Sequence, residues 1–140
     1  MTFPDSDTTY TLTVTGEQLS MISRACEIAA RACIGQLDGI AFQLLASLPT
    51  DHFCQVRDAL EAAQPTITGR PGYYAAPTEA ARAEHELAWG IYHAARYRLY
   101  LDGCAARGEQ PGGWTVLNDP PMSYGGHPVP RIERVQGVKG

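Results

Sequence analysis

The sequence predicts an α+β fold in which a small antiparallel sheet packs on two long helices and one shorter helix. Two patterns predict this fold class. Apolar and polar residues alternate near both ends of the chain, as they do in half-buried strands. Between the ends, apolar residues recur every three or four positions, as in amphipathic helices. We therefore expect the N- and C-terminal strands to pair into one sheet that covers the helices.

The first expected strand covers residues 10–15, where tyrosine, leucine and valine alternate with threonines. Thr15 and Gln18 have the spacing of a capping box, so a helix is expected to begin there and to run to about Gly39. The apolar stripe of this helix is expected to comprise Leu19, Ile22, Cys26, Ala29, Cys33, Leu37 and Ile40.

A second, shorter helix is expected over residues 51–63, with Thr50 as its cap and Asp51 in its first turn. Residues 65–78 are rich in proline, glycine and threonine and predict a linker. Structureless loops of this length are uncommon and often functional. This linker carries Arg70, Tyr73 and Tyr74 among its turn-forming residues.

The third helix is expected over residues 79–102, with Thr78 as its cap and Gly103 as its stop. Its core stripe is expected to comprise Leu87, Ile91, Ala95 and Leu99. A second face at the same spacing carries His85, Trp89, Tyr92 or His93, Arg96 and Tyr100.

Two further strands are expected over residues 114–119 and 131–135. The loop between them, residues 117–130, carries two glycines that let the backbone approach a ligand, with Asn118 and Asp119 placed to read hydroxyl or amino groups. A plain connection between strands remains the alternative. We expect residues 1–140 to form one domain, with residues 1–9 and 136–140 loose.

Composition excludes several classes of function. The chain has 140 residues and a formal net charge of -4, which argues against wrapping long DNA or RNA. No stretch has the ~18 apolar residues of a membrane span, and the first ten residues do not read as a signal peptide. A reducing cytosol is expected, and so are inert thiols, because the cysteines lack the spacing of a zinc site or a disulfide.

The common catalytic motifs are missing from the sequence, and we predict no catalytic residue, metal site or cofactor. His85 and His93 would lie about 12 Å apart along a helix, which is too far for one metal ion without a third ligand. A hydrolase that uses His85, His93 or His127 is the alternative function. It would require the fold to bring two of these histidines together.

The aromatic and arginine side chains of the third helix favour binding. Trp and Tyr stack on bases, and Arg makes bidentate contacts with phosphates. The same residue types are enriched where protein subunits meet. Either role explains the face that carries Trp89 and Arg96, and both hold if a pocket forms at a subunit interface. A ligand-free structural or regulatory protein is a further alternative.

Three segments resemble one family of phage proteins, and together they touch most of the chain from Tyr10 to Val135. They are LTVTGEQLSMISRACEIAARACIGQLDGI, with an arginine before a Gly-Gln segment at positions 31–36, then AWGIYHAARYRLY and GGWTVLNDPPMSYGGHPVPRIERV. The family is the first type of Thoeris anti-defence protein, the sponges that sequester cyclic ADP-ribose isomers. The chain departs from the pattern at Leu-Asp-Gly after the Gly-Gln segment, at Gly90, and in CAARGEQPGG.

The resemblance implies a binding protein of the host cytoplasm that traps a bacterial immune signal and does not cleave it. It also implies homodimers that assemble into hexamers, and separate sites for cyclic trinucleotides in some members. Its ligand-binding arginines and aromatics match Arg31, Arg96 and Tyr73 or Tyr74. The full expected set of ligand-binding residues is Arg31, Gln36, Tyr73, Tyr74, Trp89, Arg96, Asn118 and Asp119.

Overall fold

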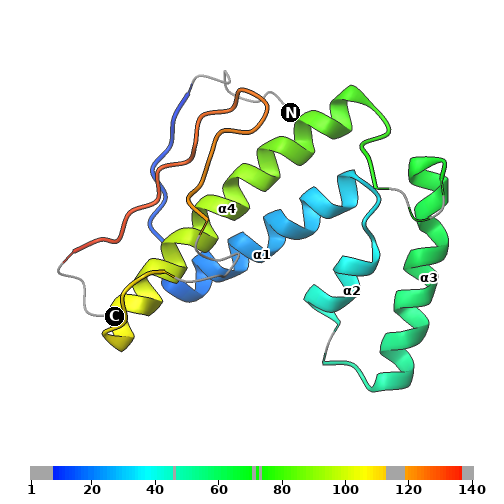
Figure 1. Ribbon diagram of the computed structural model, residues 1–140, viewed down its shortest axis with the longest axis horizontal. Coiled ribbons are helices and arrows are strands. Elements are labelled where there is room, and N and C mark those ends of the chain that lie inside the picture. Colours follow the sequence, from blue (N-terminus) through cyan, green and yellow to red (C-terminus); the bar gives the residue numbers. More distant parts are fainter. Residues whose placement is uncertain (1–7, 46, 71, 73, 113–118, 137–140) are drawn as a thin grey trace.

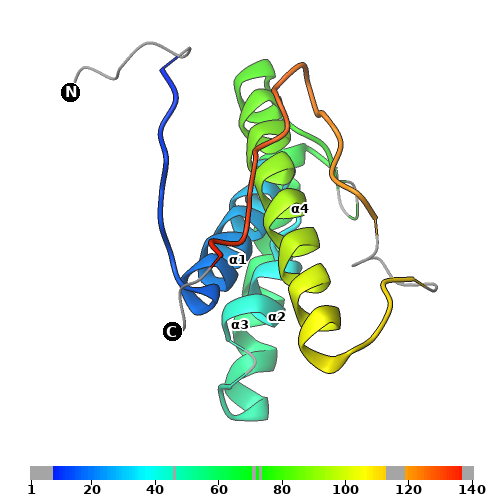
Figure 2. The ribbon, with the colours of Figure 1, turned by 90° about the vertical axis from the view of Figure 1, so that its left-hand side faces the viewer.

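The structure is a computed structural model that describes residues 8–45, 47–70, 72, 74–112 and 119–136. These residues form four helices, α1 (Gly16–Cys33), α2 (Asp38–Leu44), α3 (Thr50–Thr68) and α4 (Glu79–Arg107). α1 and α4 pack along each other in opposite directions, and α2 connects this pair to α3 (Figure 1). The two terminal segments run outside the helices as extended chain (Figures 1 and 2).

The expected α+β fold is wrong, because the described part of the chain is helical and contains no sheet. Residues 10–15 and 131–135 follow extended paths, but Figure 2 shows the two segments well apart. Of the expected strand at 114–119, residues 114–118 lie outside the described residues. A strand is stabilised by hydrogen bonds to a neighbouring strand. The strands predicted from the alternation are therefore wrong, because alternation within one segment cannot supply the neighbouring strand.

α1 and α4 begin where the sequence predicts. The Thr15 side chain accepts from the Gln18 backbone and the Gln18 side chain accepts from the Thr15 backbone, so the capping box is confirmed. The Thr78 side chain accepts from the backbone of Ala81 and caps α4. These caps depend only on residues within one turn, which is why the sequence predicts them well.

The helix ends differ from the prediction. α1 stops at Cys33, six residues before Gly39, because the chain turns at Gly35 with a left-handed φ of 74°. α4 continues through Gly103 to Arg107 and ends at Gly108, where φ is 67°. A glycine inside a helix costs only ~1 kcal/mol, so a well-packed helix can pass through it.

α3 is longer than expected and has no side-chain cap at its start. Thr50 is its first helical residue, Pro49 occupies the cap position, and the helix runs through Pro65 to Thr68. Residues 65–68 of the predicted linker at 65–78 are therefore helical. The buried side chain of Gln64 stabilises the last turn of α3, since its amide donates a hydrogen bond to the Thr68 hydroxyl at 2.7 Å.

The seam between α1 and α4 is made of small and polar residues. Its buried members are Ser23, Glu27 and Ala30 on α1 and His93, Ala94, Ala95 and Cys104 on α4. The expected stripes match it only in part. Ala95 lies in the seam as expected, but Ala30 is fully buried while Ala29 is exposed, and Leu87 is 47% exposed. Large apolar residues therefore lie beside this seam and not in its centre.

Candidate functional site

His85 joins the start of α4 to the end of α1. Its Nδ1 lies 2.8 Å from the carbonyl oxygen of Ala30, one of the last four carbonyls of α1. Such carbonyls have no partner within the helix. The Nδ1–H of His85 therefore satisfies α1, which gives this histidine a structural role.

Arg31, an expected ligand contact, is held by protein groups. Its Nε and Nη2 donate to Glu27 Oε1 at 3.0 and 2.8 Å, and its Nη1 donates to Gln36 Oε1 at 2.5 Å. Its guanidinium carbon lies 5.8 Å from the centre of the Trp89 ring. The structure thus brings Arg31, Gln36 and Trp89 together as a half-buried cluster between α1 and α4.

A row of aromatic rings follows the same side of α4. Trp89 lies 5.1 Å from Tyr92 and 5.0 Å from His93 between ring centres. His93 in turn lies 5.6 Å from Tyr124 of the C-terminal segment. This row ties the C-terminal segment to the helix pair, so these rings are engaged in packing.

Arg96 continues the row by one turn. Its Nη1 donates to the Tyr92 hydroxyl at 3.1 Å, and its Nη2 lies 3.3 Å from His93 Nδ1. Its guanidinium carbon lies 5.0 Å from the centre of the Tyr92 ring. No described carboxylate pairs with Arg96, so its charge is not neutralised by the fold.

His93 is 9% exposed, and its pKa lies below the ordinary value of 6.5. Burial is the largest cause, the positive charge of Arg96 adds to it, and the charge of Asp119 acts in the opposite direction. His93 is therefore neutral at pH 7. Because arginine only donates hydrogen bonds, Nδ1 must be the acceptor and Nε2 must carry the proton.

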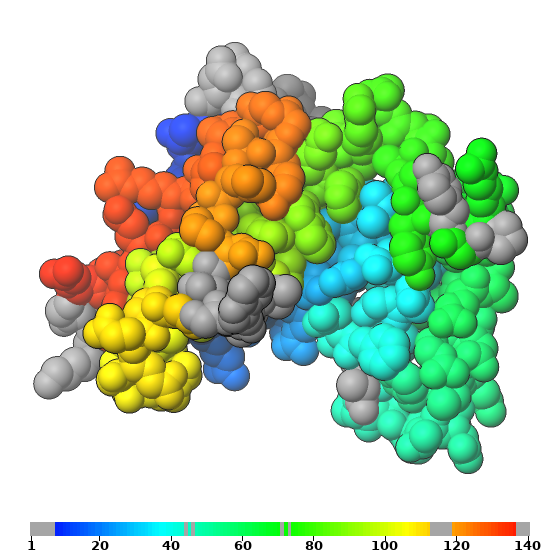
Figure 3. All heavy atoms as spheres, viewed as in Figure 1, coloured from blue at the N-terminus to red at the C-terminus, as the bar shows by residue number. Residues whose placement is uncertain are grey.

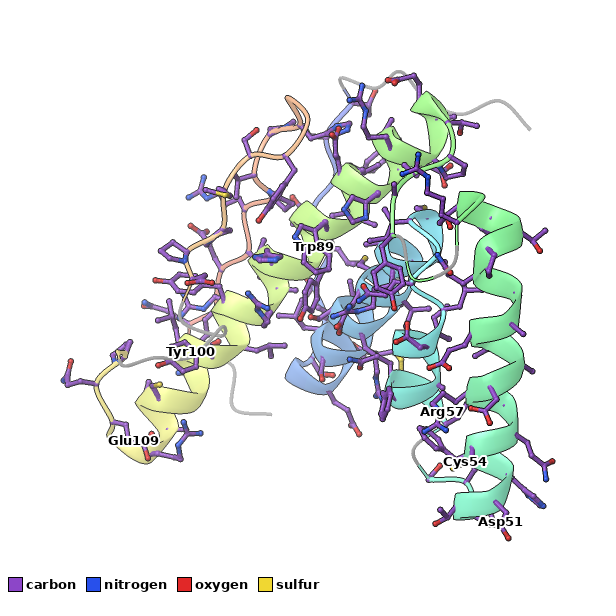
Figure 4. The ribbon with its side chains drawn as sticks, turned by 45° about the vertical axis from the view of Figure 1, so that its right-hand side comes forward. Asp51, Cys54, Arg57, Trp89, Tyr100 and Glu109 are labelled. Carbon is purple, nitrogen blue, oxygen red and sulfur yellow. The ribbon has the colours of Figure 1, made fainter. Side chains whose placement is uncertain are left out.

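An open cavity of about 550 Å³ lies where early α1, late α4 and α2 meet. Figure 3 shows the surface hollowed on the side where α2 and α3 diverge from α1 and α4. Figure 4 places Tyr100, one of the lining residues, on this distal half of α4. The lining residues are Ser20, Ser23, Arg24, Glu27, Gln43, Arg96, Leu99, Tyr100, Gly103 and Arg107.

Three arginines and one glutamate give this cavity a positive balance. Arg107 has an exposed partner in Glu109 at 3.0 Å, and Glu27 is occupied by Arg31. Arg24 and Arg96 have no ion-pair partner among the described residues. The cavity can therefore hold an anion with more than one negative charge.

Of the six expected ligand-binding residues that the structure describes, Arg96 alone is among those that line the cavity. Tyr73 and Asn118 lie outside the described residues. Tyr74 lies near the start of α2, where its hydroxyl donates to Asp38 Oδ1 at 3.2 Å. Asp119 is exposed, and its charge acts on His93.

Sequence reasoning missed Arg24 and Arg107 as candidates. A usable signal was present, because residues 96, 100, 103 and 107 share one face of a helix at spacings of three and four. On α1, the polar residues 20, 23, 24 and 27 follow the same rule. Only packing the two helices in opposite directions brings these faces together.

The described residues include no group of three or more His, Cys, Asp or Glu side chains that could bind a metal ion. Within the same part of the chain, no helix has the length and apolar character needed to cross a membrane. No family model, curated protein or solved structure matches the chain.

Proposed function

We propose that this protein binds a small cyclic nucleotide and retains it without cleaving it. The observation that carries the proposal is the cavity of about 550 Å³, which Arg24, Arg96 and Arg107 line from two helices. Ligand pockets of roughly 300–1,000 Å³ are the usual size for small molecules. The cavity lies in that range.

The charges of the lining favour two phosphates. Arg24 and Arg96 lack carboxylate partners in the described part of the chain. Arg107 forms an ion pair with the exposed Glu109. Guanidinium groups bind phosphate oxygens in bidentate fashion. Ser20, Ser23 and Gln43 add neutral hydrogen-bonding groups for ribose hydroxyls, and Tyr100 offers an aromatic face.

The lining also supports retention over hydrolysis. None of the four histidines is among the lining residues of this cavity. His85 is hydrogen-bonded to the Ala30 carbonyl, and His93 accepts a hydrogen bond from Arg96. A hydrolase would need an acid or base within hydrogen-bond reach of the reacting atoms, and these two have other roles.

The resemblance to the Thoeris anti-defence sponges supplies the biological setting of the proposal. The ligand is then a cyclic ADP-ribose isomer, with cyclic oligonucleotides as further ligands. A phage would make the protein in the host cytoplasm, where it would remove the signal of a bacterial TIR-domain or related immune enzyme. Sequestration of this kind needs binding near nanomolar, which is about -12 kcal/mol.

A homo-oligomer is part of the proposal. Tyr10 and Leu12, 75% and 72% exposed on the extended N-terminal segment, are suited to an interface between subunits.

Calorimetry with cyclic ADP-ribose isomers and a panel of cyclic di- and trinucleotides tests this function. We expect one class to bind, and mass spectrometry after heat release to recover it intact. Arg24→Ala and Arg96→Ala should each weaken binding roughly ten- to a hundredfold, as for a lost charged hydrogen bond. Arg82→Ala is the matched control, because Arg82 pairs with Glu79 on the exposed start of α4.

Each other outcome selects an alternative. Recovery of a cleaved nucleotide would identify a hydrolase. If calorimetry detects no binding of any cyclic nucleotide and the protein still forms its oligomer, the protein has a structural role without a ligand. Loss of the oligomer in Arg96→Ala would assign Arg96 to assembly.

A further inference from the structure

The position of Arg96 in the cavity depends on two neighbours that are not among its lining residues. Its Nη1 donates to Tyr92 and its Nη2 to His93, both on the preceding turn of α4. The Arg96 Nε is buried and has no hydrogen-bond partner in the described structure. These two contacts, together with the Tyr92 ring, are therefore what orients the guanidinium.

The contact with His93 requires one protonation state. Arg96 can only donate, so His93 Nδ1 must keep a free lone pair. A proton on Nδ1 would remove this acceptor and place a second positive charge within 3.3 Å of Arg96. His93 Nε2 is also buried with no described hydrogen-bond partner, so an imidazolium gains no compensating contact there.

The charged groups around His93 come from three parts of the chain. Arg96 lies on its own helix, and Asp119 acts from the C-terminal segment, which also brings the Tyr124 ring. On α1, Glu27 is taken by Arg31, whose guanidinium lies over the Trp89 ring beside His93. Among the described residues, the charge of Asp119 favours the protonated form of His93, and Asp119 is exposed.

We infer that His93 and Tyr92 are positioning residues for Arg96, and that protonation of His93 releases Arg96 from its place in the cavity. This inference rests on the proposed function, because it concerns the binding of an anion at the same site. It makes retention of the nucleotide dependent on pH. The ligand is held above the range in which His93 titrates and is released more readily below it.

The direction in which affinity changes with pH follows from the ordinary histidine pKa of 6.5 and from the lowering of the His93 pKa in the folded protein. At pH 7.5 His93 is neutral and holds Arg96. As the pH falls below 6.5 toward the lowered value, His93 gains a proton and the contact is lost. Affinity should therefore decrease on acidification, although the protein as a whole becomes more positive.

The test measures the dissociation constant of cyclic ADP-ribose at pH 7.5 and at pH 5. In the unmodified protein we expect the constant to be larger at pH 5 than at pH 7.5, because protonated His93 no longer accepts the hydrogen bond from Arg96. In His93→Gln, the amide oxygen can accept from Arg96 and does not titrate, so the ratio should approach one. His52→Gln, an exposed histidine on α3, should keep the ratio of the unmodified protein.

The two glutamine variants also correct for any titration of the ligand, which is the same in both. A His93→Gln protein that keeps the pH dependence of the unmodified chain would overturn the inference. Tyr92→Phe retains the ring and removes the other acceptor, so it should weaken binding several-fold at pH 7.5. Unchanged affinity in this variant would remove Tyr92 from the positioning role.

A measurement without ligand separates this inference from the proposed function. The imidazole of His93 is titrated by nuclear magnetic resonance in the free protein and in Arg96→Gln. We expect the His93 pKa to be higher in the variant, because the neighbouring positive charge is gone. If no cyclic ADP-ribose isomer or cyclic di- or trinucleotide binds at any pH, the proposed function fails, and an unchanged His93 pKa in Arg96→Gln overturns the positioning role by itself.

Discussion

At the level of single residues, the most informative position is Glu27, a carboxylate at the centre of a helix seam. It is 6% exposed, and one of its oxygens accepts two hydrogen bonds from Arg31. Burying a charge is costly unless a partner compensates it. Arg31, itself fixed by Gln36 and Trp89, provides this compensation. Glu27 therefore links the packing of α1 on α4 to the charge of the cavity.

Glu27→Gln should destabilise the fold by roughly 1–3 kcal/mol, because the half-buried Arg31 loses its counter-charge. The measurement is the free energy of unfolding in urea. Asp58→Asn is the control, since the Arg57–Asp58 pair is exposed and such pairs contribute about 0–1 kcal/mol. Equal effects in the two variants would show that burial of Glu27 has no energetic consequence.

At the level of elements, the turn after α1 decides how α3 meets the rest of the molecule. Gly35 is buried with φ of 74°, and a Cβ at this position would lie 2.5 Å from the Cγ2 methyl of Thr68 on α3. Gly69 ends α3 with nearly the same φ of 77°, yet a Cβ there would meet nothing within 4 Å. Comparing substitutions at Gly35 and Gly69 therefore distinguishes the cost of backbone strain from the cost of a steric clash.

Gly35→Ala should cost more stability than Gly69→Ala, although both residues have a left-handed backbone. The strain of ~1–2 kcal/mol is common to the two variants, and overpacking adds ~1–3 kcal/mol at Gly35 alone. Urea unfolding of both proteins measures the difference. Adding Thr68→Ser, which deletes the obstructing methyl, should recover part of the loss in Gly35→Ala. Equal costs for the two glycines would refute the close approach of α3.

At the level of the whole molecule, the helices do not all pack into one bundle. α3 contacts α2 and stands away from α4, and extended segments flank α4 (Figures 1 and 2). Residues 8–14 make no backbone hydrogen bond to another described residue. Unpaired extended backbone with exposed apolar side chains commonly pairs with another chain. This supports the homo-oligomer that we propose.

Sedimentation should therefore give a mass above the 15.2 kDa of one chain. Replacing Tyr10 and Leu12 together by serine should shift the equilibrium toward the monomer, because their apolar surface would leave the interface. Thr11→Ser with Thr13→Ser, on the other face of the same segment, should leave the mass unchanged. A monomer at all concentrations would contradict the proposed assembly.

Parts of the site that depend on contacts within one helix could be predicted from the sequence, and parts that depend on contacts between helices could not. The row of Trp89, Tyr92, His93 and Arg96 was recognised from helical spacing alone, and its members do contact one another. Arg31 was expected to bind ligand, yet it is held by Glu27 four residues earlier and by Gln36. Which arginine stays unpaired depends on packing between helices, and spacing within one helix does not contain that information.

The sequence by itself determined where α1 and α4 begin, because caps at Thr15 and Thr78 involve neighbours within one turn. Only the tertiary structure decided that residues 10–15 pair with no strand among the described residues, and that α1 stops at Cys33, before the turn at Gly35. It alone placed Arg24 of α1 opposite Arg96 and Arg107 of α4. The physical reason is that caps are local hydrogen bonds, whereas sheets and cavities require surfaces that meet only when distant segments pack.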